Sequence, residues 1–170
     1  MYDYNSIFMS KNGYKQDTYV LFTKTDSPFG YKQQEHEFLS YPVLGIGIAA
    51  RSYIEKTQYT SYDTATCKES DIIEFIKEVE ENPFVAKLGI ELNDDMFIRR
   101  YVLLRMLLFE RGLFFSEFSK KFGNSAIEFF KKELKILDEN EMIIKYKDRV
   151  ILSDKGKRFS NFLPVLLNKI

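Results

Sequence analysis

The segment from residue 41 to residue 54 restricts the possible folds more than any other. It reads Tyr-Pro-Val-Leu-Gly-Ile-Gly-Ile-Ala-Ala-Arg-Ser-Tyr-Ile, an apolar run in which Gly45 and Gly47 alternate with larger side chains. Glycine weakens a strand interior, so two alternating glycines suggest that another group approaches the backbone closely. We therefore predict a buried β-strand over 41–50 with one bare face. The approaching group is either another element of the protein or a bound ligand.

Length and composition describe a globular chain. Its 170 residues are 45% apolar and 16% aromatic, enough for one domain or two small ones with a buried core. The 25 basic and 25 acidic residues cancel, so bulk charge does not favour nucleic acid as a partner. A single cysteine, Cys67, allows no internal disulfide and no multi-cysteine metal site, and it fits a reducing cytoplasm.

The sequence also lacks the marks of a secreted or membrane protein. Its first residues have no basic start followed by an apolar run, so we expect no secretory leader. No apolar run reaches the roughly 18 residues that a membrane-spanning helix needs. We therefore expect a cytoplasmic protein with no membrane contact.

Residues 1–93 are expected to alternate short helices and strands. Turn signals and hydrophobic periodicity place these elements. The predicted elements are a helix over 3–12, a strand over 18–23, a loop or edge strand over 30–39, an exposed strand or hairpin over 53–62 centred on 59–62, an amphipathic helix over 70–82 and a short link over 89–93.

Residues 94–170 are expected to form a helical domain with one hairpin. The helix from Asp95 to about Arg111 is apolar on nearly every side, which is typical of a helix buried on most sides. Helices over 114–122 and 125–139, a hairpin of 142–146 with 150–152, and a last helix from Asp154 follow. This order of elements favours a winged-helix-like domain.

Three segments resemble motifs of one protein family. Residues 44–54 resemble the GxGxxAxS segment late in the barrel of radical S-adenosylmethionine enzymes of the oxygen-independent coproporphyrinogen III oxidase type. Residues 92–103 resemble the ungapped LxxDDxIRRxVI start of their C-terminal domain. Residues 152–161 resemble their closing LTxxGRxxxN phrase.

The resemblance implies an α+β chain in three parts: a barrel-end segment over 1–64, a helical connector over 65–93 and the winged-helix-like domain over 94–170. Members of the family use S-adenosylmethionine and a 4Fe-4S cluster held by CxxxCxxC, and they remove hydrogen from propionate side chains. Because Cys67 alone cannot hold that cluster, we expect no cofactor and no metal in this chain by itself. The resemblance thus implies a C-terminal fragment of a porphyrin-biosynthesis oxidoreductase, or a truncated relative, that covers the barrel mouth without being catalytic alone.

Partners and site residues follow from the same resemblance. The expected partners are the missing N-terminal radical S-adenosylmethionine barrel and a tetrapyrrole-like or other large substrate. Carried over by position, Gly45, Gly47, Ala49 and Ser52 would bind the cofactor. Arg51 stands where the family has an uncharged residue, so it would bind a substrate carboxylate. No catalytic residue and no metal ligand is assigned.

Other candidates have a structural interpretation beside the functional one. His36 is either a solvated loop side chain or a site residue. Arg99 and Arg100 either pair with nearby acidic residues or hold a substrate carboxylate. Lys131, Lys132 and Lys135 form a basic helix face, which is typical of a solvated surface. The alternative function is a stand-alone winged-helix module that binds DNA or a partner protein.

Overall fold

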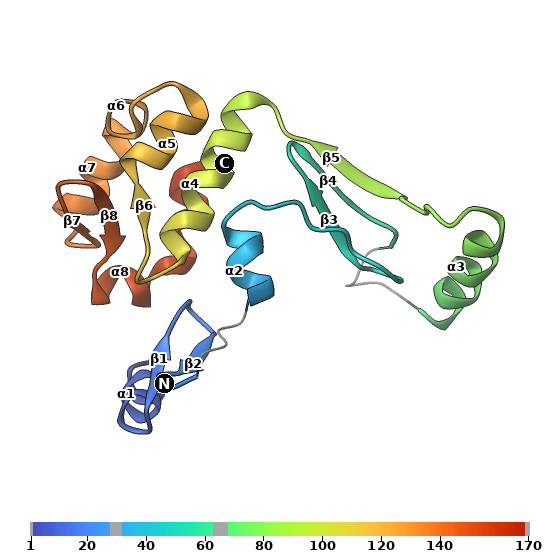
Figure 1. Cartoon of the computed structure of the whole chain (residues 1–170), viewed down its shortest axis with the longest axis horizontal. Coiled ribbons are helices and arrows are strands. Elements are labelled where there is room, and N and C mark those ends of the chain that lie inside the picture. Colours follow the sequence, from blue (N-terminus) through green and yellow to red (C-terminus); the bar gives the residue numbers. More distant parts are fainter. Residues whose placement is uncertain (1, 28–31, 63–67, 169–170) are drawn as a thin grey trace. The chain divides into compact units, whose positions relative to one another are not determined.

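The computed structural model describes residues 2–27, 32–62 and 68–168. It has the mixed α+β composition that the sequence predicts, with small antiparallel sheets (Figure 1). The chain packs as two units, one formed by Met1–Leu39 with Ile98–Ile170 and the other by Ser40–Phe97. We describe each unit by itself. The domain boundaries expected after residues 64 and 93 stay predictions.

The first unit begins with a helix and a short hairpin. Helix α1 (Tyr2–Lys11) confirms the first predicted helix, and Gly13 then turns the chain with a positive φ of 80°. Strands β1 (Tyr14–Gln16) and β2 (Phe22–Lys24) pair antiparallel. The strand predicted over 18–23 is therefore only partly confirmed: β2 includes residues 22 and 23, whereas residues 17–20 form the bend between β1 and β2.

The loop predicted over 30–39 is also wrong, because helix α2 (Lys32–Phe38) lies there. Its last carbonyl groups lack partners within the helix. The buried guanidinium of Arg105 supplies them, donating to the carbonyl oxygens of Phe38 at 3.1 Å and Leu39 at 2.9 Å. A tertiary contact that the polar sequence of α2 does not display thus caps the end of this helix.

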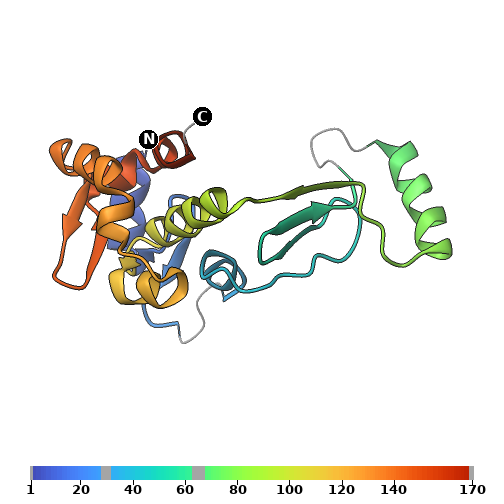
Figure 2. The same ribbon diagram turned by 90° about the horizontal axis from the view of Figure 1, so that it is seen from above.

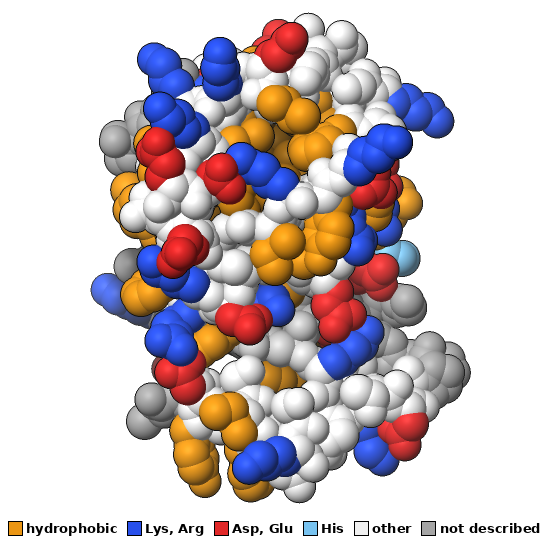
Figure 3. Space-filling model, turned by 90° about the vertical axis from the view of Figure 1, so that its left-hand side faces the viewer, with side chains coloured by type: hydrophobic (Ala, Val, Ile, Leu, Met, Phe, Trp, Pro, Cys, Tyr) orange, Lys and Arg blue, Asp and Glu red, His pale blue; other side chains and the backbone are white. Residues whose placement is uncertain are grey.

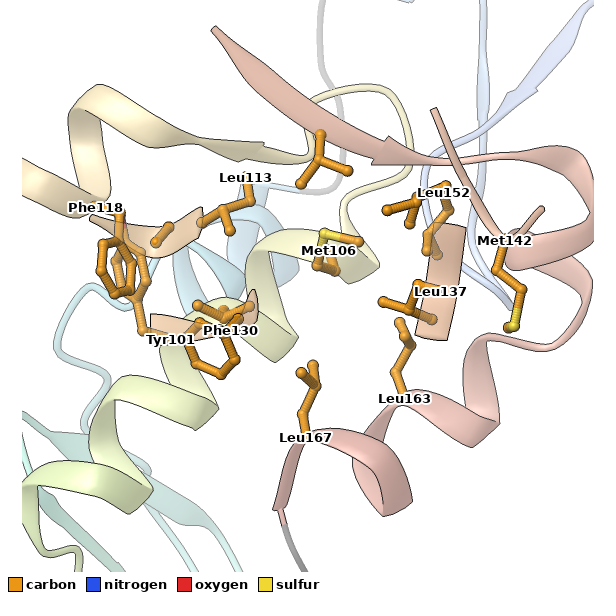
Figure 4. Packing of buried hydrophobic residues seen from close by; sticks show 14 of the residues in the cluster. Tyr101, Met106, Leu113, Phe118, Phe130, Leu137, Met142, Leu152, Leu163 and Leu167 are labelled. Atoms are coloured by element: carbon orange, nitrogen blue, oxygen red, sulfur yellow. The ribbon is translucent and has the colours of Figure 1, made fainter. Parts of the chain in front are cut away.

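Helix α4 (Asp94–Leu107) is the long helix that the sequence predicts, and its burial is confirmed. The helix ends four residues earlier than expected, and the chain turns at Gly112, where φ is 67°. A Cβ at Gly112 would lie 2.2 Å from the carbonyl oxygen of Val150, so only glycine fits. Figure 4 shows most of the core beside α4. The buried residues of this core are Tyr101, Val102, Met106, Phe109, Leu113, Phe118, Ala126, Phe130, Leu137, Met142, Ile143, Val150, Leu152, Leu163 and Leu167.

Short helices and a three-stranded antiparallel sheet enclose this core. Helix α5 (Phe115–Phe122) and the hairpin confirm the sequence prediction. The helix predicted over 125–139 is interrupted at Phe130, whose ring is fully buried and whose φ and ψ are −106° and 26°. The sheet has the order β6-β8-β7. The remaining elements are α6 (Ala126–Phe129), α7 (Lys131–Glu139), β6 (Leu113–Phe114), β7 (Ile143–Lys145), β8 (Arg149–Leu152), α8 (Asp154–Arg158), η1 (Ser160–Phe162) and α9 (Leu163–Asn168).

Arg99 joins three helices of this unit. Its side chain is buried, and its Nη1 donates to Glu133 Oε1 of α7 at 3.1 Å and to the Leu167 carbonyl oxygen of α9 at 2.9 Å. The ion-pairing interpretation of Arg99 is therefore confirmed, although the acceptor lies on α7 instead of near residue 94. These partners compensate the cost of burying the Arg99 charge. Removing either Arg99 or Glu133 would leave the other charge buried without a partner, which is strongly destabilising.

The second unit holds a three-stranded antiparallel sheet and one helix. Strands β3 (Arg51–Ile54), β4 (Thr57–Thr60) and β5 (Leu88–Glu91) follow the order β3-β4-β5, so β5 occupies part of the predicted link. Helix α3 (Glu69–Glu81) confirms the amphipathic helix. Figures 1 and 2 both draw α3 beyond one end of the sheet, so it covers neither sheet face.

The buried strand predicted over 41–50 is wrong. Its only ladder pairing in the described chain is a single bridge between Val43 and Tyr53, after which the chain is irregular and turns at residues 48 and 49. Leu44 and Ile46 are 62% and 90% exposed, so this segment is not buried within its unit.

Among the described helices, none is long and apolar enough to span a membrane.

Replacing Arg99 with Ala is expected to destabilise the first unit by about 3 kcal/mol, because Glu133 would remain buried without its cation. Lys135→Ala is the matched control: Lys135 and Glu139 form an exposed pair on α7, worth about 0.5 kcal/mol or less. Urea unfolding followed by circular dichroism measures both changes. Equal losses of unfolding free energy in the two variants would contradict the role of Arg99 in holding α7 and α9 against α4.

Candidate functional site

The predicted site residues of the glycine segment are held together by two buried serine hydroxyls. Ser52 is 1% exposed, and its Oγ accepts a hydrogen bond from the Gly45 amide at 3.0 Å. Ser61 is 5% exposed; its Oγ accepts from the Ala49 amide at 3.1 Å and donates to the Gly47 carbonyl oxygen at 3.2 Å. The segment is therefore an ordered loop fastened at two points.

The glycines of this loop serve two different purposes. A Cβ at Gly45 would lie 2.5 Å from the Arg51 carbonyl oxygen, so the group that approaches its backbone is the chain itself. Gly47 has a φ of 104°, and a Cβ there would meet nothing within 4 Å. Gly47 thus turns the loop, and it leaves open space in front of an exposed backbone. Ala49, with φ at 58°, completes the turn.

Arg51 lies on the opposite face of the sheet from Ser52, because neighbouring strand residues alternate in direction. Cross-strand pairing places Thr60 and Leu88 on the same face as Arg51, and Gln58 and Ile90 beside them. These residues line a shallow hollow of about 240 Å³. A guanidinium beside polar groups and exposed apolar side chains is suited to an amphipathic carboxylate.

The structure thus divides the predicted site residues into two groups. Gly45, Gly47, Ala49 and Ser52 come together in the loop, whereas Arg51 projects from the other face of β3. Ser52 has a structural partner that the sequence does not reveal. The assignment of the loop to a cofactor and of Arg51 to a substrate carboxylate stays a prediction.

The other candidates lie elsewhere. His36 is exposed in α2, where a loop was expected. Cys67 lies outside the described residues. In the described chain, no three or more His, Cys, Asp or Glu side chains gather so that they could hold a metal ion.

Sequence reasoning missed an ionisable cluster in the second unit, centred on Lys87. Its ammonium contacts Glu74 and Glu78 at 2.7 Å each and the Tyr62 hydroxyl at 2.5 Å. These hydrogen bonds raise the pKa of Lys87 above its ordinary 10.5, and Lys87 lowers the pKa of Glu78 below 4.5. Shifted pKa values often mark functional sites. Here the partners belong to α3 and its flanks, so the cluster fastens α3 to the segment before β5.

Comparison with known proteins identifies a related fold. The structure of coproporphyrinogen III oxidase from Escherichia coli, described as a radical SAM enzyme, matches with a TM-score of 0.70 at 17% sequence identity. The match covers 97% of this chain and 39% of that one, a C-terminal part. No protein-family model and no curated protein matches the chain.

This match confirms the predicted resemblance at the level of fold. The chain spans well under half the length of the similar structure, so the activity of the whole enzyme does not pass to it by similarity alone. The resemblance depended in part on a strand over 41–50, which is absent, and on the helix from residue 94, which is present. The support now comes from the arrangement of nearly the whole chain.

Replacing Ser52 with Ala is expected to leave the Gly45 amide without an acceptor and to loosen the loop. An unsatisfied buried group costs about 1–3 kcal/mol, so exchange of the Gly45 amide hydrogen should accelerate at least fivefold. Arg51→Ala is the control, because this side chain lies on the other face. Hydrogen exchange followed by NMR tests the pair, and unchanged exchange in Ser52→Ala would contradict the fastening role.

Replacing Lys87 with Met is expected to release α3 in a pH-dependent way. The lowered pKa of Glu78 means that the pair stabilises the fold above about pH 4.5 and stops doing so as Glu78 is protonated in acid. The raised pKa of Lys87 preserves the pair up to at least pH 10.5.

The difference in α3 hydrogen exchange between the wild type and Lys87→Met should therefore be largest between these limits and should shrink below about pH 4.5. Lys77→Met, an exposed lysine of the same helix, is the control. A difference that stays constant from pH 3 to pH 8 would refute the electrostatic origin.

Proposed function

We propose that this chain is the C-terminal part of a coproporphyrinogen III oxidase-like radical S-adenosylmethionine protein. The observation that supports this most strongly is the fold match, which covers 97% of this chain and 39% of the similar enzyme. On this proposal the chain completes the barrel and covers its mouth, and it is not catalytic alone.

The iron–sulfur cluster of such a protein does not fit the residues of this chain. Three thiolates hold a cluster of this kind, and the sequence contains one cysteine. No described group of side chains offers an alternative set of ligands. The cluster and the chemistry that depends on it therefore belong, on this proposal, to a polypeptide segment or partner that carries CxxxCxxC.

Exposed apolar surface in the second unit supports the idea that it packs against such a barrel. Leu88 and Ile90 of β5 are 50% and 47% exposed on the Arg51 face of the sheet. Helix α3 presents Ile72, Ile73 and Ile76 to solvent. A soluble unit does not gather apolar groups on both a sheet and a helix without a reason, and a protein interface is the usual one.

The fastened loop at residues 43–50 has a place in this proposal. Its two serine contacts use the Gly45 and Ala49 amides, so the open backbone at Gly47 is the part that a cofactor would meet. Arg51 would meet a carboxylate of a tetrapyrrole-like or other large substrate from the opposite face of β3. The first unit, with its own core, would act as the cover.

The winged-helix interpretation of residues 94–170 fits the order α5, α6, α7 and the β7–β8 hairpin. In this proposal the domain covers the substrate. The balanced charge of the chain and the acidic residues Glu133, Asp138 and Glu139 on α7 do not favour DNA as its partner.

The test is to recover this chain from its source cells with an antibody and to identify what accompanies it by mass spectrometry. We expect its peptides in a longer polypeptide, or in a complex with one, that contains CxxxCxxC. The reconstituted assembly should cleave S-adenosylmethionine. The chain recovered alone, with no such sequence attached or bound, would contradict the proposal.

A matched pair of variants locates the contact if the barrel is a separate polypeptide. Ile90→Asp places a charge on the exposed sheet face and is expected to weaken the complex at least tenfold. Ile136→Asp places the same charge on α7, where the isoleucine is 41% exposed, and should leave the complex intact. Equal effects of the two substitutions would contradict packing through the sheet.

A further inference from the structure

A second hollow, in the first unit, has no role in the proposed function. It has a volume of about 340 Å³, within the range of small-molecule sites. Its apolar wall comes from α5, α6, α7 and the β7–β8 hairpin. Figure 3 shows apolar side chains recessed in this face of the molecule, with Lys and Arg side chains along the edge. The apolar lining residues are Phe115, Ile127, Leu134, Tyr146 and Val150.

The bottom of the hollow is part of the core. Val150 is 1% exposed and Leu134 packs against the buried cluster, so these positions are rigid. Ile127 and Tyr146, in contrast, are 52% and 46% exposed. The hollow therefore offers an apolar floor that is fixed by the fold and side walls that remain open to a ligand.

The charged residues of the hollow are mostly positive. Its lining includes four lysines and one aspartate, Asp138. The aspartate is already neutralised by Lys145, whose Nζ lies 2.5 Å from Asp138 Oδ2. Lys135 pairs with Glu139 at 3.5 Å. Lys131 and Lys147 line the same hollow, and neither forms an ion pair with an acidic side chain of the described residues.

We propose that this hollow binds a small amphipathic carboxylate. The apolar part of the ligand would lie on Leu134 and Val150, and its carboxylate would lie near the ammonium groups of Lys131 and Lys147. The aliphatic stems of the lysines would extend the apolar wall while their charged ends stay in water. Binding needs no residue of the second unit and is independent of the proposed function.

The observations favour a small anion over a nucleic acid. A phosphate-binding surface follows a strand of charges over many nucleotides, with basic groups along its whole length. Here the basic groups surround one apolar recess, and two of the four lysines pair with acidic residues of α7. An ordinary solvated lysine face, as the sequence suggested, would not have an apolar recess between its charges.

Titration of the ¹⁵N-labelled full chain with dodecanoate, observed by NMR, tests this site. We expect saturable shifts of amides in α7 and in the β7–β8 hairpin. The double variant Lys131→Glu with Lys147→Glu should weaken binding at least tenfold. Lys132→Glu, an exposed lysine of the same helix that does not line the hollow, should change it less than twofold. The dispersed spectrum of each variant verifies its fold.

A matched ligand separates the two parts of the proposal. Dodecyltrimethylammonium has the same alkyl chain and the opposite charge, so it should bind at least tenfold more weakly than dodecanoate. Equal binding of the two amphiphiles would overturn the proposal. So would shifts confined to β3, β4, β5 and α3, or equal affinity of the wild type and the double variant. Shifts on nucleic acid addition with none on dodecanoate addition would overturn it too.

Discussion

The first unit depends on two guanidinium groups buried along α4. A buried cation is costly unless most of its donors reach acceptors, so the surrounding elements supply carbonyl and carboxylate oxygens at fixed positions. Arg99 takes these from Glu133 and from the carbonyl of Leu167. Arg105 takes them from the end of α2 and also lies over the Tyr101 ring at 4.6 Å. Three short helices, α2, α7 and α9, thus contact the buried arginines of one long helix.

Periodicity in the sequence was sufficient for the elements that bury one face. Helices α1, α3, α4 and α5 and the β7–β8 hairpin were all predicted, because caps, turn residues and apolar spacing are local signals. Prediction from periodicity failed where a contact with a residue distant in the sequence determines the local structure. Helix α2 is capped by an arginine 66 residues away from Leu39, and the kink at Phe130 follows from burial of a single ring. Neither leaves a local pattern.

The loop at residues 43–50 shows the same limit for the candidate site. Alternation of glycine with branched residues indicated a strand with a bare face, and close approach to Gly45 was correctly inferred. The approaching group is the chain's own backbone, and the two buried hydroxyls that fix the loop carry no sequence signature. The motif resemblance succeeded where the strand prediction failed, because a motif keeps the order of residues without stating their backbone conformation.

The two units differ in how completely they bury their apolar side chains. The first has a continuous core that includes Phe109, Phe118 and Phe130, each fully buried. In the described part of the second, apolar burial is confined to Tyr62 and Leu92, while the isoleucines of α3 and β5 face solvent. Because apolar burial is the main stabilising contribution to a fold, the second unit gains less stability from its own packing than the first. On the proposed function the barrel covers this sheet face, whereas the lysine-edged hollow belongs to a unit that already has its own core to support it.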